Sequence, residues 1–225
     1  MLTVPASAFA EGWGGSLGAT TDYVFRGVSQ SDGKPSVQAD GHYYGSSGWF
    51  AGLWAASVRS DADSSNSAEL NGYLGYAWPV TDAWSAKLTA VQYAYTGGNS
   101  QRRYDYDELA GTLAYTNRVF LTAAASPNTS VDSTRGTFTH RAAFSYDLAV
   151  HQPLGYAISA NAGIGYYDLH RLLRTGYVYW NAGLSYDYGA AQFDVSYIGT
   201  NAAAKSLFYG DAAENRWVAS VLWHF

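Results

Sequence analysis

The last ten residues, Arg216-Trp217-Val218-Ala219-Ser220-Val221-Leu222-Trp223-His224-Phe225, alternate strictly between two faces. One face carries Trp217, Ala219, Val221, Trp223 and Phe225. Successive side chains of a β-strand point to opposite sides of its sheet, so the pattern predicts a strand with a continuous apolar face. A soluble protein would leave such a terminus to fray. The pattern is instead typical of the closing strand of an outer-membrane barrel, and we expect the outer-membrane assembly machinery to recognise it.

The composition also favours a barrel. The 225 residues include no Cys, 20 Tyr and 8 Trp, and only 14% are charged, against about 25% in soluble domains. Mean hydropathy is −0.18 and no run of about 18 apolar residues occurs, so a transmembrane helix is not expected. The absence of Cys excludes thiol catalysis, disulfides and thiolate metal sites, and we expect no cofactor. The net charge of −5 argues against nucleic acid as a partner.

Residues 1–10, MLTVPASAFA, are expected to be the remnant of a signal peptide. Ala8-Phe9-Ala10 has the small-x-small pattern of a signal peptidase site. The barrel would then occupy residues 11–225. A plain N-terminal tail is the alternative interpretation.

The two-residue period recurs from Trp13 onward and predicts twelve antiparallel strands. Between Leu70 and Trp78, for example, every second residue is apolar or glycine, while Glu69, Asn71 and Tyr73 share the other face. The segment 49–58 is apolar on both faces, so its orientation stays open. The strands are expected near residues 13–25, 37–44, 49–58, 69–78, 84–95, 106–115, 119–126, 138–148, 158–166, 180–187, 192–200 and 216–225. We therefore predict an all-β, 12-stranded, antiparallel up-and-down transmembrane β-barrel.

The links between these strands alternate between short and long. Short links are expected at 45–48, 79–83, 116–117, 152–155 and 189–191, and long ones at 29–34, 59–67, 96–104, 127–136, 168–175 and 201–214. Outer-membrane barrels have short periplasmic turns and longer external loops. We therefore expect a bacterial outer-membrane location with both termini periplasmic, surrounded by lipid and lipopolysaccharide.

This topology sorts the tryptophans into two girdles at the membrane interfaces. The expected girdle residues are Trp13, Trp49, Trp78, Trp84, Trp223 and Phe225 at the periplasmic strand ends, and Trp180 and Trp217 near the outer ends. Tyr23 and Phe25 are also expected at the outer girdle, whereas Trp54 fits neither. A soluble β-sandwich would need no such sorting.

The stretch from Ser16 to Tyr44, SLGATTDYVFRGVSQSDGKPSVQADGHYY, resembles the opening of the TorF-type porins of proteobacteria, also called the Gcw_chp family. The pattern TTDYVFRGxSQSxGKPxxQ matches as Thr20 to Gln38. Later strands resemble the family only in general style. The resemblance implies an outer-membrane barrel with a pore role. It implies no particular substrate and no functional residues to carry over.

Lumen-facing residues set the selectivity of a barrel, and the parity of the strands assigns charged residues to that face. The expected pore-lining residues are the acids Asp22, Asp40, Glu69, Glu108, Asp147, Asp187 and Asp194 and the bases Arg26, Lys87 and Arg141. The excess of acids predicts a narrow, weakly cation-preferring passive path for small solutes of unknown identity. Alternatively, these charges pair and fill the interior, leaving a non-conducting structural or partner-binding barrel.

The segment from Arg26 to Pro35 is the most motif-like link. Asp32-Gly33 is a turn dipeptide and Pro35 suits the edge of a strand, so we expect a rigid external hairpin. In the alternative interpretation, Arg26 lies at the pore mouth and binds a carboxylate or phosphate of a ligand.

An enzymatic barrel is the minor alternative, and we expect no catalysis. Asp105-x-Asp107 and Asp168-x-His170 match the two residue pairs that omptin-like proteases carry at the outer rim. A carboxylate that orients a histidine can activate water. Such short patterns also arise by chance in loops rich in Asp, so solvated loop charge is the simpler interpretation.

Overall fold

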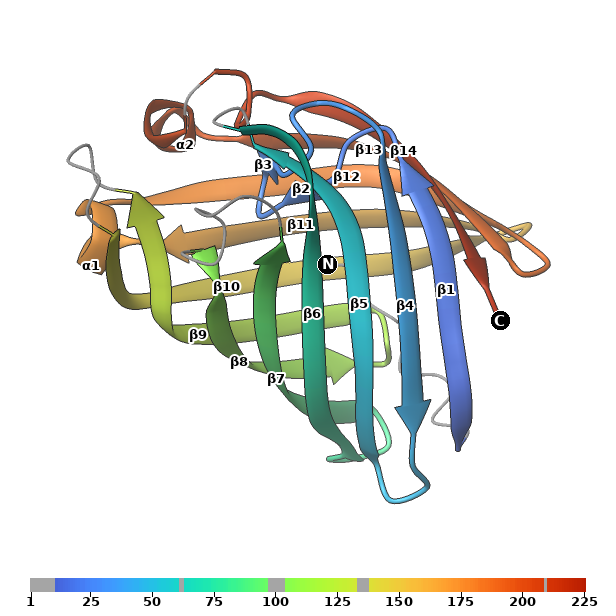
Figure 1. The fold of residues 1–225 in the computed structure, drawn as a ribbon. Coiled ribbons are helices and arrows are strands. Elements are labelled where there is room, and N and C mark those ends of the chain that lie inside the picture. Colours follow the sequence, from blue (N-terminus) through green and yellow to red (C-terminus); the bar gives the residue numbers. More distant parts are fainter. Residues whose placement is uncertain (1–10, 61–62, 97–103, 133–137, 209) are drawn as a thin grey trace.

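The protein is a closed antiparallel β-barrel in a computed structural model that describes residues 11–60, 63–96, 104–132, 138–208 and 210–225 (Figure 1). The expected signal-peptide remnant, residues 1–10, lies outside the described residues. Twelve strands form the wall, each pairing with the wall strand that follows it in sequence, and the first pairs with the last. The predicted 12-stranded up-and-down barrel is therefore confirmed.

The elements run in the order in which the sequence predicts the wall strands. The wall strands are β1 (Gly12–Thr20), β4 (Ser36–Tyr44), β5 (Trp49–Ser60), β6 (Asp63–Pro79), β7 (Trp84–Thr96), β8 (Tyr106–Tyr115), β9 (Val119–Asp132), β10 (Phe138–Gly155), β11 (Ile158–Asp168), β12 (Gly176–Tyr188), β13 (Ala191–Thr200) and β14 (Arg216–His224). A separate hairpin is formed by β2 (Val24–Phe25) and β3 (Val28–Ser29), and two short helices are α1 (His170–Leu173) and α2 (Ala202–Leu207).

Two names describe the ends of the barrel in Figure 1. The turn end carries Gly12, Phe225 and the short turns, and the loop end carries α1, α2 and the link from residue 21 to 35. Within the described ranges, no helix has the length and apolar character needed to cross a membrane.

The two-residue period separates an apolar exterior from the lumen. Leu17, Leu74 and Ile164 are 52–57% exposed on the outer surface, as alternation predicts. The structure also decides the orientation of β5. Leu53 is 73% exposed outside, whereas Phe50 is only 4% exposed and points into the lumen. Trp54 shares the face of Phe50, which explains why it fits neither girdle.

The expected girdle residues lie on the exterior. At the turn end, tryptophans pair with tyrosines of neighbouring strands, with ring centroids 4.9–5.2 Å apart for Trp13–Tyr43, Trp49–Tyr76 and Trp84–Tyr115. Trp78 stacks on Tyr76 there, and Trp223 and Phe225 are 55% and 70% exposed. Toward the loop end, Trp180 and Trp217 both contact the ring of Tyr197.

Three expectations about strand bounds are wrong. The first wall strand ends at Thr20 rather than near residue 25, because residues 21–35 leave the wall. The expected long link at 59–67 is mostly strand, since β5 continues to Ser60 and β6 begins at Asp63. Similarly, β10 continues to Gly155, so its turn to β11 is Tyr156-Ala157.

This β10–β11 turn holds two non-glycine residues at positive φ, 52° for Tyr156 and 60° for Ala157. Type I′ hairpin turns require positive φ at both central residues, which costs an L-residue about 1–2 kcal/mol. We expect Ala157→Gly to raise the free energy of unfolding by about 0.5–1 kcal/mol, measured by urea unfolding of the barrel in lipid vesicles.

Ala160→Gly, placed inside β11, is the matched control. It should lower the free energy of unfolding, because glycine weakens the interior of a strand. A glycine at position 157 that does not stabilise the barrel would show that this turn is unstrained.

Candidate functional site: a lumen crossed by the first hairpin

The hairpin β2–β3 folds into the lumen at the loop end. Phe25 pairs with Val28, leaving Arg26 and Gly27 as the two-residue loop, with φ of 49° and 79°. A Cβ on Gly27 would come within 2.8 Å of Tyr179 and 2.5 Å of Thr200, so the tip presses against the wall at β12 and β13. The predicted turn at Asp32-Gly33 forms at exposed residues. The expectation of an external hairpin is wrong for residues 24–29, which form β2–β3 in the lumen. The physical reason is that the apolar side chains of β2–β3 find partners inside the barrel.

Asp22 anchors the base of the hairpin. Its carboxylate accepts hydrogen bonds from the hydroxyls of Ser29 and Ser31, at 2.6 and 2.8 Å. Arg216, the first residue of β14, donates from Nη1 to the same carboxylate at 2.5 Å. Arg216 was missed by sequence reasoning, although it shares the lumen-facing parity of His224. Asp22 therefore lies on the inserted segment and ties it to the last strand.

Arg26 fastens the tip to the opposite wall. Its Nη2 donates to Glu108 Oε2 on β8 at 2.7 Å and to Ser145 Oγ on β10 at 2.9 Å. The guanidinium also lies over the rings of Phe25 and Tyr167, 4.8 and 4.6 Å from their centroids. The Arg26 and Glu108 side chains are only 9% and 4% exposed, so this is a buried ion pair. We call the pair the Arg26–Glu108 latch.

Aromatic residues pack around the hairpin on the side of β5 to β8. Tyr23 packs on Trp54, with ring centroids 5.4 Å apart, and its hydroxyl donates to Glu69 at 3.3 Å. Phe25 packs on Tyr93, which stacks on another tyrosine of the neighbouring strand, Tyr106. Tyr23 and Phe25 are thus lumen residues, and their expected place in the outer girdle is wrong. Together with the Arg26–Glu108 latch, these contacts hold the hairpin in place across the lumen.

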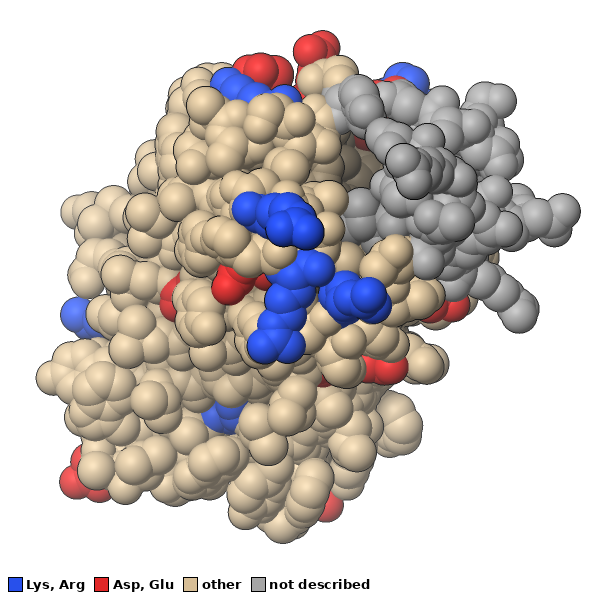
Figure 2. Space-filling view, turned by 90° about the vertical axis from the view of Figure 1, so that its left-hand side faces the viewer, with Lys and Arg blue, Asp and Glu red and all other residues tan. Residues whose placement is uncertain are grey.

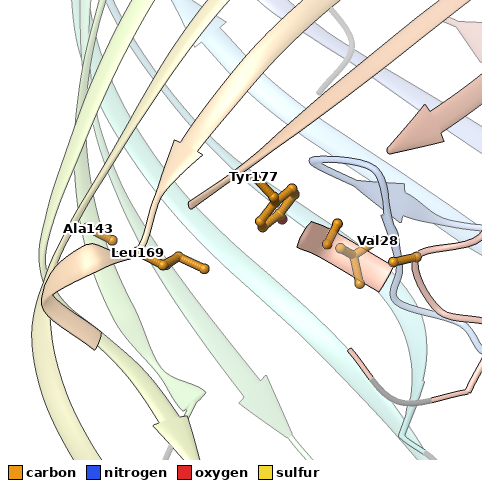
Figure 3. Packing of buried hydrophobic residues seen from close by; sticks show 6 residues of the cluster. Val28, Ala143, Leu169 and Tyr177 are labelled. Carbon is orange, nitrogen blue, oxygen red and sulfur yellow. The ribbon is translucent and has the colours of Figure 1, made fainter. Parts of the chain in front are cut away.

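An apolar cluster joins the hairpin to the loops of the opposite side (Figure 3). Val28 belongs to one buried cluster with Tyr177 of β12 and Leu169 at the start of α1. The other buried members are Ala143, Ala204 and Ala213. Leu169 lies at the start of α1 and Ala204 lies on α2, so both short helices pack onto the cluster. They help to cover this side of the lumen.

The turn-end half of the lumen carries four more of the expected charged residues. Asp40 accepts from the Tyr73 hydroxyl at 2.7 Å and contacts the His42 ring nitrogen Nδ1 at 2.5 Å. Lys87 faces this part of the lumen from β7 and makes no ion pair within the described ranges. Asp187 and Asp194 lie across the barrel on β12 and β13, equally without an ion pair among described residues.

The lumen has two unlike walls. From β5 to β9 it carries buried bulky residues such as Phe50, Val91 and Phe120, which are 4–8% exposed. From β11 to β1 the inward residues are mostly small or polar, and Asn161, Ser196 and Ser220 stay partly accessible to solvent. The wall from β11 to β1 is therefore the side of the lumen whose residues keep some accessible surface.

The other expected pore-lining residues are distributed as follows. Glu69 is buried on β6 beside Asn71, which donates to it at 2.8 Å, and Asp147 on β10 accepts from the Tyr179 hydroxyl. Arg141 instead lies exposed at the loop end, where its Nη1 donates to the His140 carbonyl. The pairing of β9 with β10 is irregular between Arg141 and Ala143. Arg141 lies on the loop-end side of this irregularity, in the part of β10 that begins at Phe138.

The two residue pairs of the protease hypothesis lie in separate parts of the wall, one at the start of β8 and the other at the link from β11 to α1. Asp105 accepts from the backbone N–H of Tyr95, and Asp107 is hydrogen-bonded to Asn128. Asp168 contacts the ring of His170 at 2.7 Å. This pair is separated from Asp105 and Asp107 along the wall, because β9 and β10 lie between β8 and β11. Across the described part of the chain, no group of three His, Asp or Glu residues is arranged to hold a metal ion.

The family model called Gcw_chp, described as a bacterial protein of unknown function, matches residues 5–225. The chain belongs to the Gcw_chp family. No curated protein matches this Gcw_chp chain in sequence.

Solved structures, two of them described as porins and one as an outer membrane protein, share the fold of the Gcw_chp barrel. The KdgM porin superposes with a TM-score of 0.58 and 9% identity over 94% of this chain and 99% of that one. The NanC porin gives the same TM-score and identity over 94% and 98% of the two chains. Omp33 of Acinetobacter baumannii gives a TM-score of 0.50 and 12% identity over 96% and 98%. At these identities the likeness establishes a porin-type barrel fold.

Proposed function

We propose that this Gcw_chp barrel is an outer-membrane porin that forms a narrow, weakly cation-preferring passive path for small solutes. The observation that carries the proposal is the solvent-accessible, small and polar wall from β11 to β1, inside a closed barrel with an apolar exterior. The hairpin β2–β3 narrows this path at the loop end. No step of the proposal requires catalysis or a cofactor.

The balance of lumen charges supports the preference for cations. Strand parity assigns the seven expected acids to the interior. The bases that contact the interior are Arg26, Lys87 and Arg216. Two of these bases already form ion pairs, Arg26 with Glu108 and Arg216 with Asp22. The remaining acidic excess lies in a low-dielectric wall, where it attracts cations and repels anions.

We also propose that the loop end faces the exterior and both termini face the periplasm. The short turns at one end and the helices α1 and α2 at the other support this orientation. The match from Thr20 to Gln38 supports a TorF-type porin of a proteobacterium. The alternating apolar face of β14 supports recognition by the assembly machinery.

Asp187→Asn combined with Asp194→Asn tests the cation preference. Removing both turn-end acids should lower the ratio of K⁺ to Cl⁻ permeability about twofold, because no described cationic side chain pairs with these carboxylates and neutralises their charge. The ratio is measured from reversal potentials across planar bilayers under a KCl gradient. The effect should shrink at high salt as the charges are screened.

Asp82→Asn removes an exposed acid from the β6–β7 turn at the same end and is the matched control. It should leave the permeability ratio unchanged. An anion-selective wild-type channel, or a double variant with the wild-type ratio, would refute the preference for cations.

A non-conducting structural or partner-binding barrel is the second candidate, because the hairpin crosses the lumen and is held by a buried ion pair. Purified folded protein that gives no channels, even after the latch is removed, would favour this candidate over the porin.

A further inference from the structure

A group of exposed arginines lies at the loop end of the barrel, around α1. Figure 2, which views the molecule from this side, shows basic side chains gathered near the centre of the surface. Arg171 and Arg174 lie in α1 and at its C-cap, and Arg141 lies on β10, on which the start of α1 packs. Within the described ranges, none of the three forms an ion pair. We call these three residues the arginine cluster.

Arg171 itself lies at the outward surface of the wall. Its guanidinium lies over the ring of Phe144, 5.5 Å from the centroid. Phe144 shares its face of β10 with Tyr146 and Leu148, which are 53% and 40% exposed on the exterior. A cation stacked on an outward aromatic ring near the end of a wall strand is suited to the interface between lipid and water. The nearby carboxylate of Asp168 is hydrogen-bonded to His170.

A shallow, open apolar hollow lies in the same exterior surface, over β8 to β12. Gly111 and Ala123 are paired across β8 and β9 and leave space between larger side chains. The surrounding residues include Leu113, Leu121, Tyr146 and Ile164. Tyr146 is two residues from Phe144, a rise of roughly 7 Å along β10. The hollow therefore begins close to the point where the arginine cluster ends.

We propose that the arginine cluster and the hollow together bind lipopolysaccharide of the outer leaflet. Lipid A is a phosphorylated disaccharide that carries several acyl chains. Arginine guanidinium groups match phosphate oxygens in geometry and charge, and the hollow takes an acyl chain beside them. The proposal goes beyond the pore function and rests on the proposed orientation, which places the loop end in the outer leaflet.

The test uses the complete folded barrel in detergent, titrated with bis-phosphorylated lipid A and followed by native mass spectrometry. The triple variant Arg141→Gln, Arg171→Gln, Arg174→Gln should bind lipid A about tenfold or more weakly, because it lacks the phosphate donors. Gly111→Leu should also weaken binding by filling the hollow. Lipid A without phosphates should bind the wild-type barrel as weakly as bis-phosphorylated lipid A binds the triple variant.

The matched control is the triple variant Lys34→Gln, Arg59→Gln, Lys205→Gln, which removes the same charge from the loop end elsewhere. It should keep wild-type affinity for lipid A. Equal loss in both triple variants, or none in the cluster variant, overturns the proposal. So does a dimer whose contacts cover Ala123, which would make a second copy the occupant of the hollow.

Failure of this proposal can be told apart from failure of the pore function. Binding in detergent does not depend on conduction, and the cluster variant should conduct like the wild type in bilayers. Orientation is tested separately by labelling a Lys205→Cys variant in intact cells, since the chain has no other cysteine.

Discussion

Arg26→Ala is expected to raise the single-channel conductance about twofold or more, because it releases the hairpin that narrows the lumen. Arg26 holds the hairpin tip through Glu108 and Ser145, at 2.7 and 2.9 Å. The substitution also leaves the buried Glu108 without its partner. Breaking a buried pair in this way costs about 3–5 kcal/mol, so we also expect a lower free energy of unfolding. Planar-bilayer recordings and urea titration measure the two effects.

A second variant separates the effect of charge at the narrow part of the lumen from the effect of the hairpin that obstructs it. Arg26→Ala alone leaves an extra negative charge at the narrow part, so the preference for cations should increase. Arg26→Ala with Glu108→Ala removes both charges, so conductance should still rise while selectivity stays near that of the wild type. The double variant should also recover part of the lost stability, since no unpaired charge is buried.

Lys34→Ala is the matched control for the latch. Lys34 pairs with Asp32 at 2.7 Å in the same segment, but both side chains are exposed, and such pairs contribute about 0–1 kcal/mol. The control should keep wild-type conductance and nearly wild-type stability. If Arg26→Ala channels matched the wild type in conductance and selectivity, the hairpin would not be the narrow part of the path.

Deletion of residues 221–225 is expected to prevent formation of the closed barrel. β1 and β14 pair through only five residue pairs, and the deletion removes four of them. Phe225 also exchanges backbone hydrogen bonds with Gly15, at 2.9 and 3.0 Å. An open edge in lipid leaves backbone groups unpaired, at several kcal/mol each. The truncated chain should therefore lose the heat-modifiable band of a folded barrel on SDS gels.

Trp223→Ala separates the backbone contribution from that of the side chain. It keeps the ladder to Leu17 and removes only a ring of the turn-end girdle. We expect a folded barrel with reduced stability, measured on the same gels and by urea titration. A truncated chain that still folded as well as Trp223→Ala would show that the β1–β14 seam is not needed for closure.

The placement of the hairpin shows where sequence reasoning reached its limit. Asp22 and Arg26 were expected in the lumen from strand parity, but they reach it on an inserted hairpin rather than on a wall strand. Alternation could not reveal this, because residues 21–25 continue the two-residue period of β1. Val28, with its apolar partners on β12 and α1, shows what draws the segment inward.

The sequence by itself determined the number of wall strands, most of their inward and outward faces and the sites of most turns. This was possible because alternation and turn residues are local, and each strand must satisfy the same lipid-facing constraint. Only the tertiary structure decided what fills the lumen. The partners of Arg26 lie 82 and 119 residues away, and Asp22 is 194 residues from Arg216. Contacts at such separations follow from the closure of the barrel, which no local pattern encodes.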